Sequence, residues 1–139
     1  KPTWHFHSRY RQGVPILDLA PWTYEEDAVL TGLRYMFTRQ FCELTPAGHV
    51  FDTQSSHPQV MVTGFSGAAG ELTLHIANAG PTRQAEINGL PAGIKALNVV
   101  RSGSGEGYYK PGAVSLTQGA TTIDLPAWSL VSLTTLKVD

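Results

Sequence analysis

Carboxylates are among the residues in this sequence that could do chemistry, because two of them can act together as acid and nucleophile; hydrolysis of a glycosidic bond, for example, needs a pair roughly 5 to 9 Å apart. Asp18 stands in the apolar run 14–20, whereas Glu25 and Glu26 stand where a helix is expected to begin. A buried carboxylate must be paired wherever it lies, so we interpret Asp18 as a structural hydrogen-bonding residue. None of these residues forms a convincing acid and nucleophile pair. We therefore predict no catalytic residue in the chain.

Histidines, serines and glycines offer no stronger signal for a reactive site. His5 and His7 would share one face of a strand, but no third ligand follows them at a specific spacing. The glycine-rich run 102–107 lies among expected strands, which favours a hairpin loop over a phosphate cradle between a strand and a helix. No Gly-x-Ser-x-Gly elbow of the strand-to-helix kind is present. We expect no metal and no other cofactor.

Aromatic side chains are the remaining candidates for a binding site, because exposed aromatic faces can stack on pyranose rings. Trp22 follows the apolar run 14–20, and Tyr108 and Tyr109 follow the glycine-rich run. We predict that these three residues contact a sugar, with simple packing as the alternative for each. Trp128 stands at the start of an alternating run, and we interpret it as a packed residue.

The elements that would position these residues change in kind near Cys42. Residues 14–20 are a short, mostly apolar run typical of a buried strand, and Pro21 ends it. Thr23 and Glu26 form a capping box. The apolar periodicity that follows predicts an amphipathic helix of roughly 18 residues. The residues expected on its buried face are Leu30, Leu33, Phe37 and Phe41. The lone cysteine has no partner for an internal disulfide, and its place in the helix favours a buried, apolar role.

From Thr45 onward the apolar residues recur with a period of two, and Gly, Pro, Asn and Ser clusters separate the runs. This spacing predicts a mainly β fold, an antiparallel β-sandwich preceded by one strand-helix unit. The predicted domains are 1–43 and 44–139. The predicted strands are 59–65, 71–78, 83–88, 96–101, 113–117, 121–125 and 129–136.

Composition narrows the classes of partner. The 139 residues fit one domain, and 42% of them are hydrophobic. Ten basic and eleven acidic residues give a formal net charge of −1, so we expect no nucleic-acid partner. No apolar run approaches the ~20 residues of a membrane-spanning helix, and we expect no membrane partner. The chain begins Lys1-Pro2 with no signal peptide, which we interpret as a processed or truncated start.

The order of these elements and two motifs carry a family resemblance. The run Leu-Pro-Ala-Trp-Ser-Leu-Val-Ser-Leu at 125–133 resembles the closing strand of glycoside hydrolases in which a (β/α)8 barrel precedes a β-sandwich. The Ser-x-x-Pro-x-Val run at 55–60, followed by a strand that ends in Asn78, is similar to the helix-to-sandwich join of the β-agarase and β-porphyranase group.

The resemblance implies a secreted or periplasmic enzyme that hydrolyses a marine galactan, such as agarose or porphyran, with two glutamates on earlier barrel strands. Residues 1–43 would then be the last βα unit of a TIM barrel, and Trp22 would stand at the catalytic face. The expected partners are the polysaccharide and the preceding barrel of the same enzyme. The alternatives are a free-standing carbohydrate-binding or adhesion β-sandwich and a structural β domain of a secreted assembly.

Overall fold

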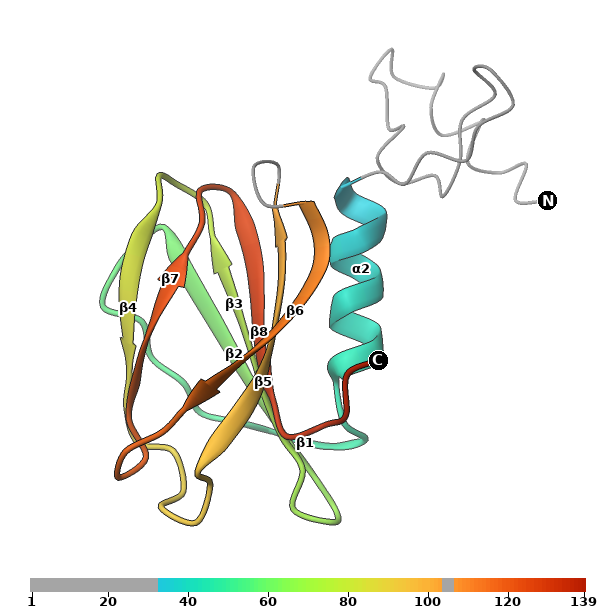
Figure 1. The fold of residues 1–139 in the computed structure, drawn as a ribbon, viewed down its shortest axis with the longest axis vertical. Helices are drawn as coiled ribbons and strands as arrows, with labels where there is room; N and C mark the ends of the chain where they lie inside the picture. The colour runs from blue at the N-terminus through green and yellow to red at the C-terminus, as the bar shows by residue number, and fades with distance from the viewer. Residues whose placement is uncertain (1–32, 104–106) are drawn as a thin grey trace, which may run out of the picture.

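The computed structural model describes residues 33–103 and 107–139, and it is mainly β (Figure 1). One helix and eight strands occur within this part of the chain. Their bounds are α2 Leu33–Leu44, β1 Gly48–Phe51, β2 Val60–Gly67, β3 Leu72–Asn78, β4 Arg83–Ile87, β5 Ala96–Gly103, β6 Gly107–Ser115, β7 Thr121–Leu125 and β8 Ser129–Thr134.

The strands form two sheets that face each other. The larger sheet has the order β1-β2-β3-β8-β5-β6, and the smaller sheet contains β4 and β7. Every paired neighbour is antiparallel. The predicted antiparallel β-sandwich after a helix is therefore confirmed. The predicted strand at 14–20 lies outside the described residues.

All seven predicted strands correspond to observed ones, and the 121–125 prediction agrees with β7 at both ends. The strand β1 was not predicted, because its four residues lack a clear alternation and are largely exposed. The strand β6 begins six residues before the predicted 113. Its Pro111 and Gly112 are residues that normally weaken a strand assignment, and here they lie in the sheet's edge strand.

The core lies between the two sheets. Its members are apolar side chains that alternate along the strands, and those on β3, β5 and β8 are almost completely buried. The strand β8 is buried at all six positions, because the sandwich core covers one face and α2 covers much of the other. The core cluster consists of Leu72, Leu74, Ile76, Leu90, Leu97, Val99, Leu116, Ile123, Leu125, Val131 and Leu133.

The buried face of α2 differs from the predicted face. Met36, Gln40 and Leu44 are buried, whereas Phe41 is 39% exposed. Met36, Gln40 and Leu44 are spaced four residues apart, so they lie on one side of the helix. The prediction was wrong for Phe41, because it followed apolar residues alone, and the helix places the polar Gln40 at the centre of its contact with the sheet. Phe37 is half-buried, and Leu30 and the side chain of Leu33 lie outside the described part of the chain. Cys42 is exposed, which also corrects its predicted burial.

Trp128 is 62% exposed, so its predicted packing was wrong. It occupies the tight connection between β7 and β8, where its φ of 49° is in the left-handed region. Its amide donates to the Gly80 carbonyl at 3.1 Å, which fixes the turn while the indole projects outward. The buried Asn78 side chain supports the same turn, since its amide nitrogen lies 2.9 Å from the Pro81 carbonyl and 3.0 Å from the Pro126 carbonyl.

Candidate functional site

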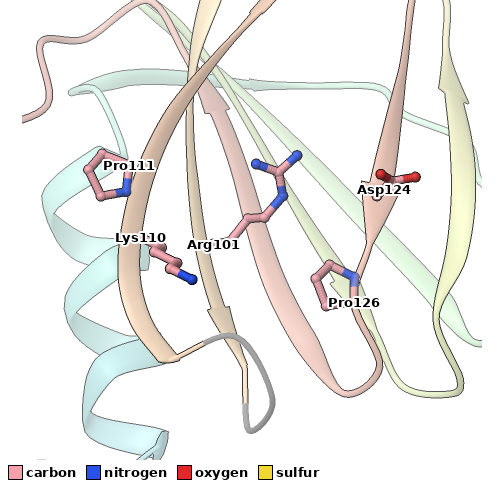
Figure 2. Close-up of a pocket in the computed structure, with 5 residues that line it drawn as sticks. All are labelled: Arg101, Lys110, Pro111, Asp124 and Pro126. Atoms are coloured by element: carbon pink, nitrogen blue, oxygen red, sulfur yellow. The ribbon is translucent and has the colours of Figure 1, made fainter.

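A pocket of about 440 Å³ opens beside β5 and the edge strand β6, at the end of β7 (Figure 2). It is lined by Arg101, Lys110, Pro111, Asp124 and Pro126. Figure 2 shows the Arg101 guanidinium between Lys110 on one side and Asp124 with Pro126 on the other. The pocket therefore combines two cations, one carboxylate and two proline rings.

Strand pairing brings the two cations together. Arg101 on β5 pairs directly with Lys110 on β6, and directly paired residues point to the same face of a sheet. Among the described residues, no hydrogen bond or ion pair reaches either side chain. Asp124, across the pocket, accepts a hydrogen bond from the Gln84 amide at 3.1 Å. The pocket thus presents two cationic donor groups and a carboxylate with acceptor capacity remaining.

A separate and larger hollow lies between the two sheets. It measures about 970 Å³, and its wall includes β2 and β3 on one side and β4 on the other. Apolar side chains form its floor, among them Val60, Val62, Leu74, Ile76 and Ile87. Its rim is polar. We call this hollow the inter-sheet groove.

A buried histidine with a serine partner has the residue types of a hydrolytic pair, but its surroundings are structural. His75 Nδ1 lies 2.8 Å from the Ser132 hydroxyl, and His75 Nε2 lies 2.8 Å from the Thr45 hydroxyl. Burial lowers the pKa of His75 to about 4, so its ring is neutral at pH 7. Ser132 has no exposed surface, and no substrate reaches it. The histidine therefore has no access to external chemistry.

The predicted sugar-contacting residues do not meet in one described site. Trp22 lies outside the described residues, and Tyr108 belongs to β6 but its side chain is not among those described. The Tyr109 ring lies against α2, with the Arg39 guanidinium carbon 4.7 Å from its centroid. Burial, together with the Glu43 carboxylate, raises the pKa of Tyr109. The sugar-contact prediction stays untested for all three.

The described residues contain no group of three or more His, Cys, Asp or Glu side chains that could hold a metal ion. His5 and His7 lie outside this part of the chain. No helix between 33 and 139, as far as the structure describes it, is long and apolar enough to cross a membrane.

Sequence reasoning missed the Arg101 and Lys110 pair. It had placed Arg101 at the end of a strand and had begun the next strand after Lys110. The glycine-rich run indicates a hairpin between these two residues, but the irregular register of β5 and β6, which brings Arg101 opposite Lys110, has no signal in the sequence.

Solved structures share this fold. The chain superposes on a GH30 endoxylanase from Clostridium papyrosolvens C71 with a TM-score of 0.66 and 19% identity, covering 75% of this chain and 28% of that one. A glycoside hydrolase family 30 subfamily 8 xylanase from Clostridium acetobutylicum gives a TM-score of 0.70 and 18% identity, with coverages of 83% and 30%. The catalytic domain of GH30 xylanase C from Talaromyces cellulolyticus gives 0.61 and 21%, with coverages of 82% and 26%.

The chain thus has a fold found in GH30 glycoside hydrolases and spans less than a third of the length of these three neighbours. These three neighbours are named as xylanases, not as agarases or porphyranases. No protein family model matches the sequence, and no curated protein matches it.

Proposed function

We propose that this chain is the C-terminal portion of a polysaccharide-degrading glycoside hydrolase, in which its β-sandwich supports a preceding catalytic barrel and is not catalytic alone. The likeness of the helix and sandwich to part of each GH30 xylanase chain carries this proposal.

The outer face of the larger sheet offers a surface for the barrel. Val50 on β1 pairs with Phe65 on β2, and the Phe65 ring packs edge-on against Phe41 of α2 at 5.6 Å between centroids. Val50 is 68% exposed and Met61, on the same face of β2, is 58% exposed. Exposed apolar side chains gathered in this way mark a contact surface. We assign Val50 and Met61 to the contact with the barrel.

The proposed boundary between the barrel unit and the sandwich lies at residues 43 and 44. Residues 1–43 would be the last βα unit of the barrel, and α2 would connect it rigidly to the sandwich. Its buried Gln40 donates to the Val100 carbonyl at 3.0 Å and to the Leu130 carbonyl at 3.2 Å. An enzyme that degrades extracellular polysaccharide is expected to be secreted or periplasmic.

Two observations favour different substrates. The Ser-x-x-Pro-x-Val run at 55–60 favours a marine galactan such as agarose or porphyran, whereas the activity named for the neighbours favours xylan. The decisive experiment extends the reading frame upstream of Lys1 and measures release of reducing ends from xylan, agarose and porphyran. The extended protein should act on one of them. The proposal fails if no barrel is encoded upstream.

A free-standing carbohydrate-binding module is the second candidate, and the exposed Trp128 favours it, because an outward indole on a fixed turn can stack on a sugar ring. Affinity electrophoresis in gels that contain xylan or agarose tests this function. Retardation that is lost in Trp128→Ala, with Met61→Ala as the control for an exposed apolar residue, would support it. Equal mobility in gels with and without polysaccharide would reject it.

A further inference from the structure

We propose that the pocket formed by Arg101, Lys110 and Asp124 binds a negatively charged sugar unit, one that bears a carboxylate or a sulfate ester. The two cations would hold the anionic group, and the carboxylate would accept a hydrogen bond from a ring hydroxyl. The choice of a sugar rests on the proposed function. The anionic part of the ligand rests on the geometry of the pocket alone.

Arg101 and Lys110 form a pair of cations whose positive charge is uncompensated. Two like charges directly opposite each other on one face of a sheet repel and destabilise it. Arg101 is half-buried, which raises the cost of leaving its guanidinium without a partner. Within the described residues neither cation has a hydrogen bond or an ion pair, and the Asp124 carboxylate bonds Gln84 rather than either cation. An external anion between Arg101 and Lys110 would remove the repulsion.

The backbone conformation of β5 and β6 sets the register that places Arg101 opposite Lys110. Between the pairs Arg101↔Lys110 and Gly103↔Gly107, β6 has two residues where β5 has one, so the ladder contains a β-bulge. Tyr109 in the bulge has a φ of 52°, a conformation that costs an L-residue roughly 1 to 2 kcal/mol. Its amide donates to the Ser102 hydroxyl at 2.8 Å, and that hydroxyl donates to Gln40 at 2.6 Å. These hydrogen bonds therefore keep the strained Tyr109 backbone in place next to Lys110.

The size and the lining of the pocket suit a sugar unit better than a bare anion. A pocket of about 440 Å³ lies in the range of small-molecule sites, and it is open enough for one unit of a longer chain to enter. The Pro111 and Pro126 rings add apolar walls for the faces of a sugar ring. Arg101 supplies the planar, two-donor geometry that suits carboxylate and sulfate oxygens. A bare anion would use the cations and leave Asp124 and the prolines without contact.

The test is a titration of the folded chain followed by backbone amide chemical shifts in NMR. The four probes are methyl glucuronide, galactose 6-sulfate, methyl glucoside and sodium sulfate. We expect saturable shifts at Arg101 and Lys110 with one or both anionic sugars, and the stronger binder identifies the anion as carboxylate or sulfate ester. We expect none with methyl glucoside and a weaker response to sodium sulfate.

Three variants sharpen the result. Arg101→Gln should weaken binding of the anionic sugar about tenfold or more, because it removes a charge-assisted, two-donor contact. Asp124→Ala should weaken binding of the sugar and should not weaken binding of sodium sulfate, because the carboxylate repels a bare anion. Lys95→Gln is the matched control, since it removes an equal charge from the residue that precedes β5, at the end of the strand far from the pocket, where the Lys95 ammonium donates to the Ala92 carbonyl.

Three outcomes would overturn the proposal. The first is no saturable shift with either anionic sugar. The second is an equal loss of binding in Lys95→Gln and Arg101→Gln, which would show attraction by overall charge. The third is equal affinity for sodium sulfate and the sugars, which would leave an anion site without sugar recognition. None of these outcomes depends on a barrel upstream of Lys1, so the proposed function fails or stands by its own experiment.

Discussion

The two flanks of the larger sheet are completed in opposite ways. On the outer face, α2 covers β5 and β8 (Figure 1). Its buried Gln40 hydrogen-bonds polar groups of both strands. On the inner face, the inter-sheet groove leaves apolar side chains of β2 and β4 beside an open hollow of about 970 Å³. One flank is fixed by hydrogen bonds and the other relies on incomplete apolar packing.

The hydrogen bonds of the covered flank have a defined direction. Gln40 donates to the Ser132 hydroxyl at 2.8 Å, and the same hydroxyl lies 2.8 Å from His75 Nδ1. The Thr45 hydroxyl donates to the Phe41 carbonyl, so His75 Nε2–H donates to Thr45. The histidine is therefore the neutral Nε2–H tautomer. A continuous network of hydrogen bonds therefore links α2, the larger sheet and the loop at Thr45, and the bonds in such a network strengthen one another.

Substitution at the centre of the covered flank should have the largest effect. Gln40→Leu keeps the approximate volume and leaves the Val100 and Leu130 carbonyls and the Ser102 hydroxyl without their partner. We expect a loss of about 3 to 4 kcal/mol in the free energy of unfolding, because each unpaired buried group costs about 1 to 3 kcal/mol. Urea unfolding measures it. Cys42→Ser, at an exposed position of the same helix, is the control and should stay within about 0.5 kcal/mol.

The covered flank should also respond to pH through His75. Its pKa of about 4 in the folded state lies below the 6.5 of the unfolded state, so the unfolded chain binds more protons between these values. Stability should be complete above about pH 6.5 and fall as the pH drops toward 4, by up to about 3 kcal/mol. Urea midpoints at pH 7 and pH 4.5 measure this loss.

The variant His75→Asn separates this contribution from that of the carboxylates. It removes the titrating group and should flatten the part of the pH dependence between 4 and 6.5. A wild-type slope that survives unchanged in His75→Asn would show that the histidine is not responsible.

The open flank should tolerate truncation better than the closed core. Val62 lines the inter-sheet groove and is half-buried, whereas Val131 on β8 has no exposed surface. We expect Val131→Ala to cost about 2 to 3 kcal/mol and Val62→Ala about 1, because solvent already reaches the groove and no closed cavity forms there. Equal losses in urea unfolding would mean that the groove is closed in solution.

The exposed side of α2 should show the smallest effect. Arg39 and Glu43 form an ion pair at 2.8 Å, one turn apart, and nearly half of each side chain is exposed. The Arg39 guanidinium also lowers the pKa of Glu43. Solvent screens such a pair, so Glu43→Gln should cost at most about 0.5 kcal/mol. A loss near that of Gln40→Leu would contradict the assignment of helix anchoring to the buried face.

The sequence was sufficient to predict the sandwich, because strands such as 121–125 alternate clearly between buried and exposed positions. It was not sufficient for contacts made across the chain. Gln40 bonds residues 60 and more positions away, and no local pattern signals a buried polar anchor. Trp128 misled the prediction, because a large aromatic residue usually packs, whereas its left-handed φ and its turn direct it outward. The Arg101 and Lys110 pair needed the register of β5 and β6.

The supporting role of the sandwich is tested most directly by calorimetric melting of this chain alone and of the same chain joined to its upstream sequence. If the sandwich and a barrel stabilise each other, the joined protein melts in one transition at a higher temperature than the isolated chain. Val50→Asp, on the exposed apolar face of β1, should lower that temperature in the joined protein and leave the isolated chain unchanged. Identical melting of the sandwich in both proteins, with no effect of Val50→Asp, would contradict a supporting role.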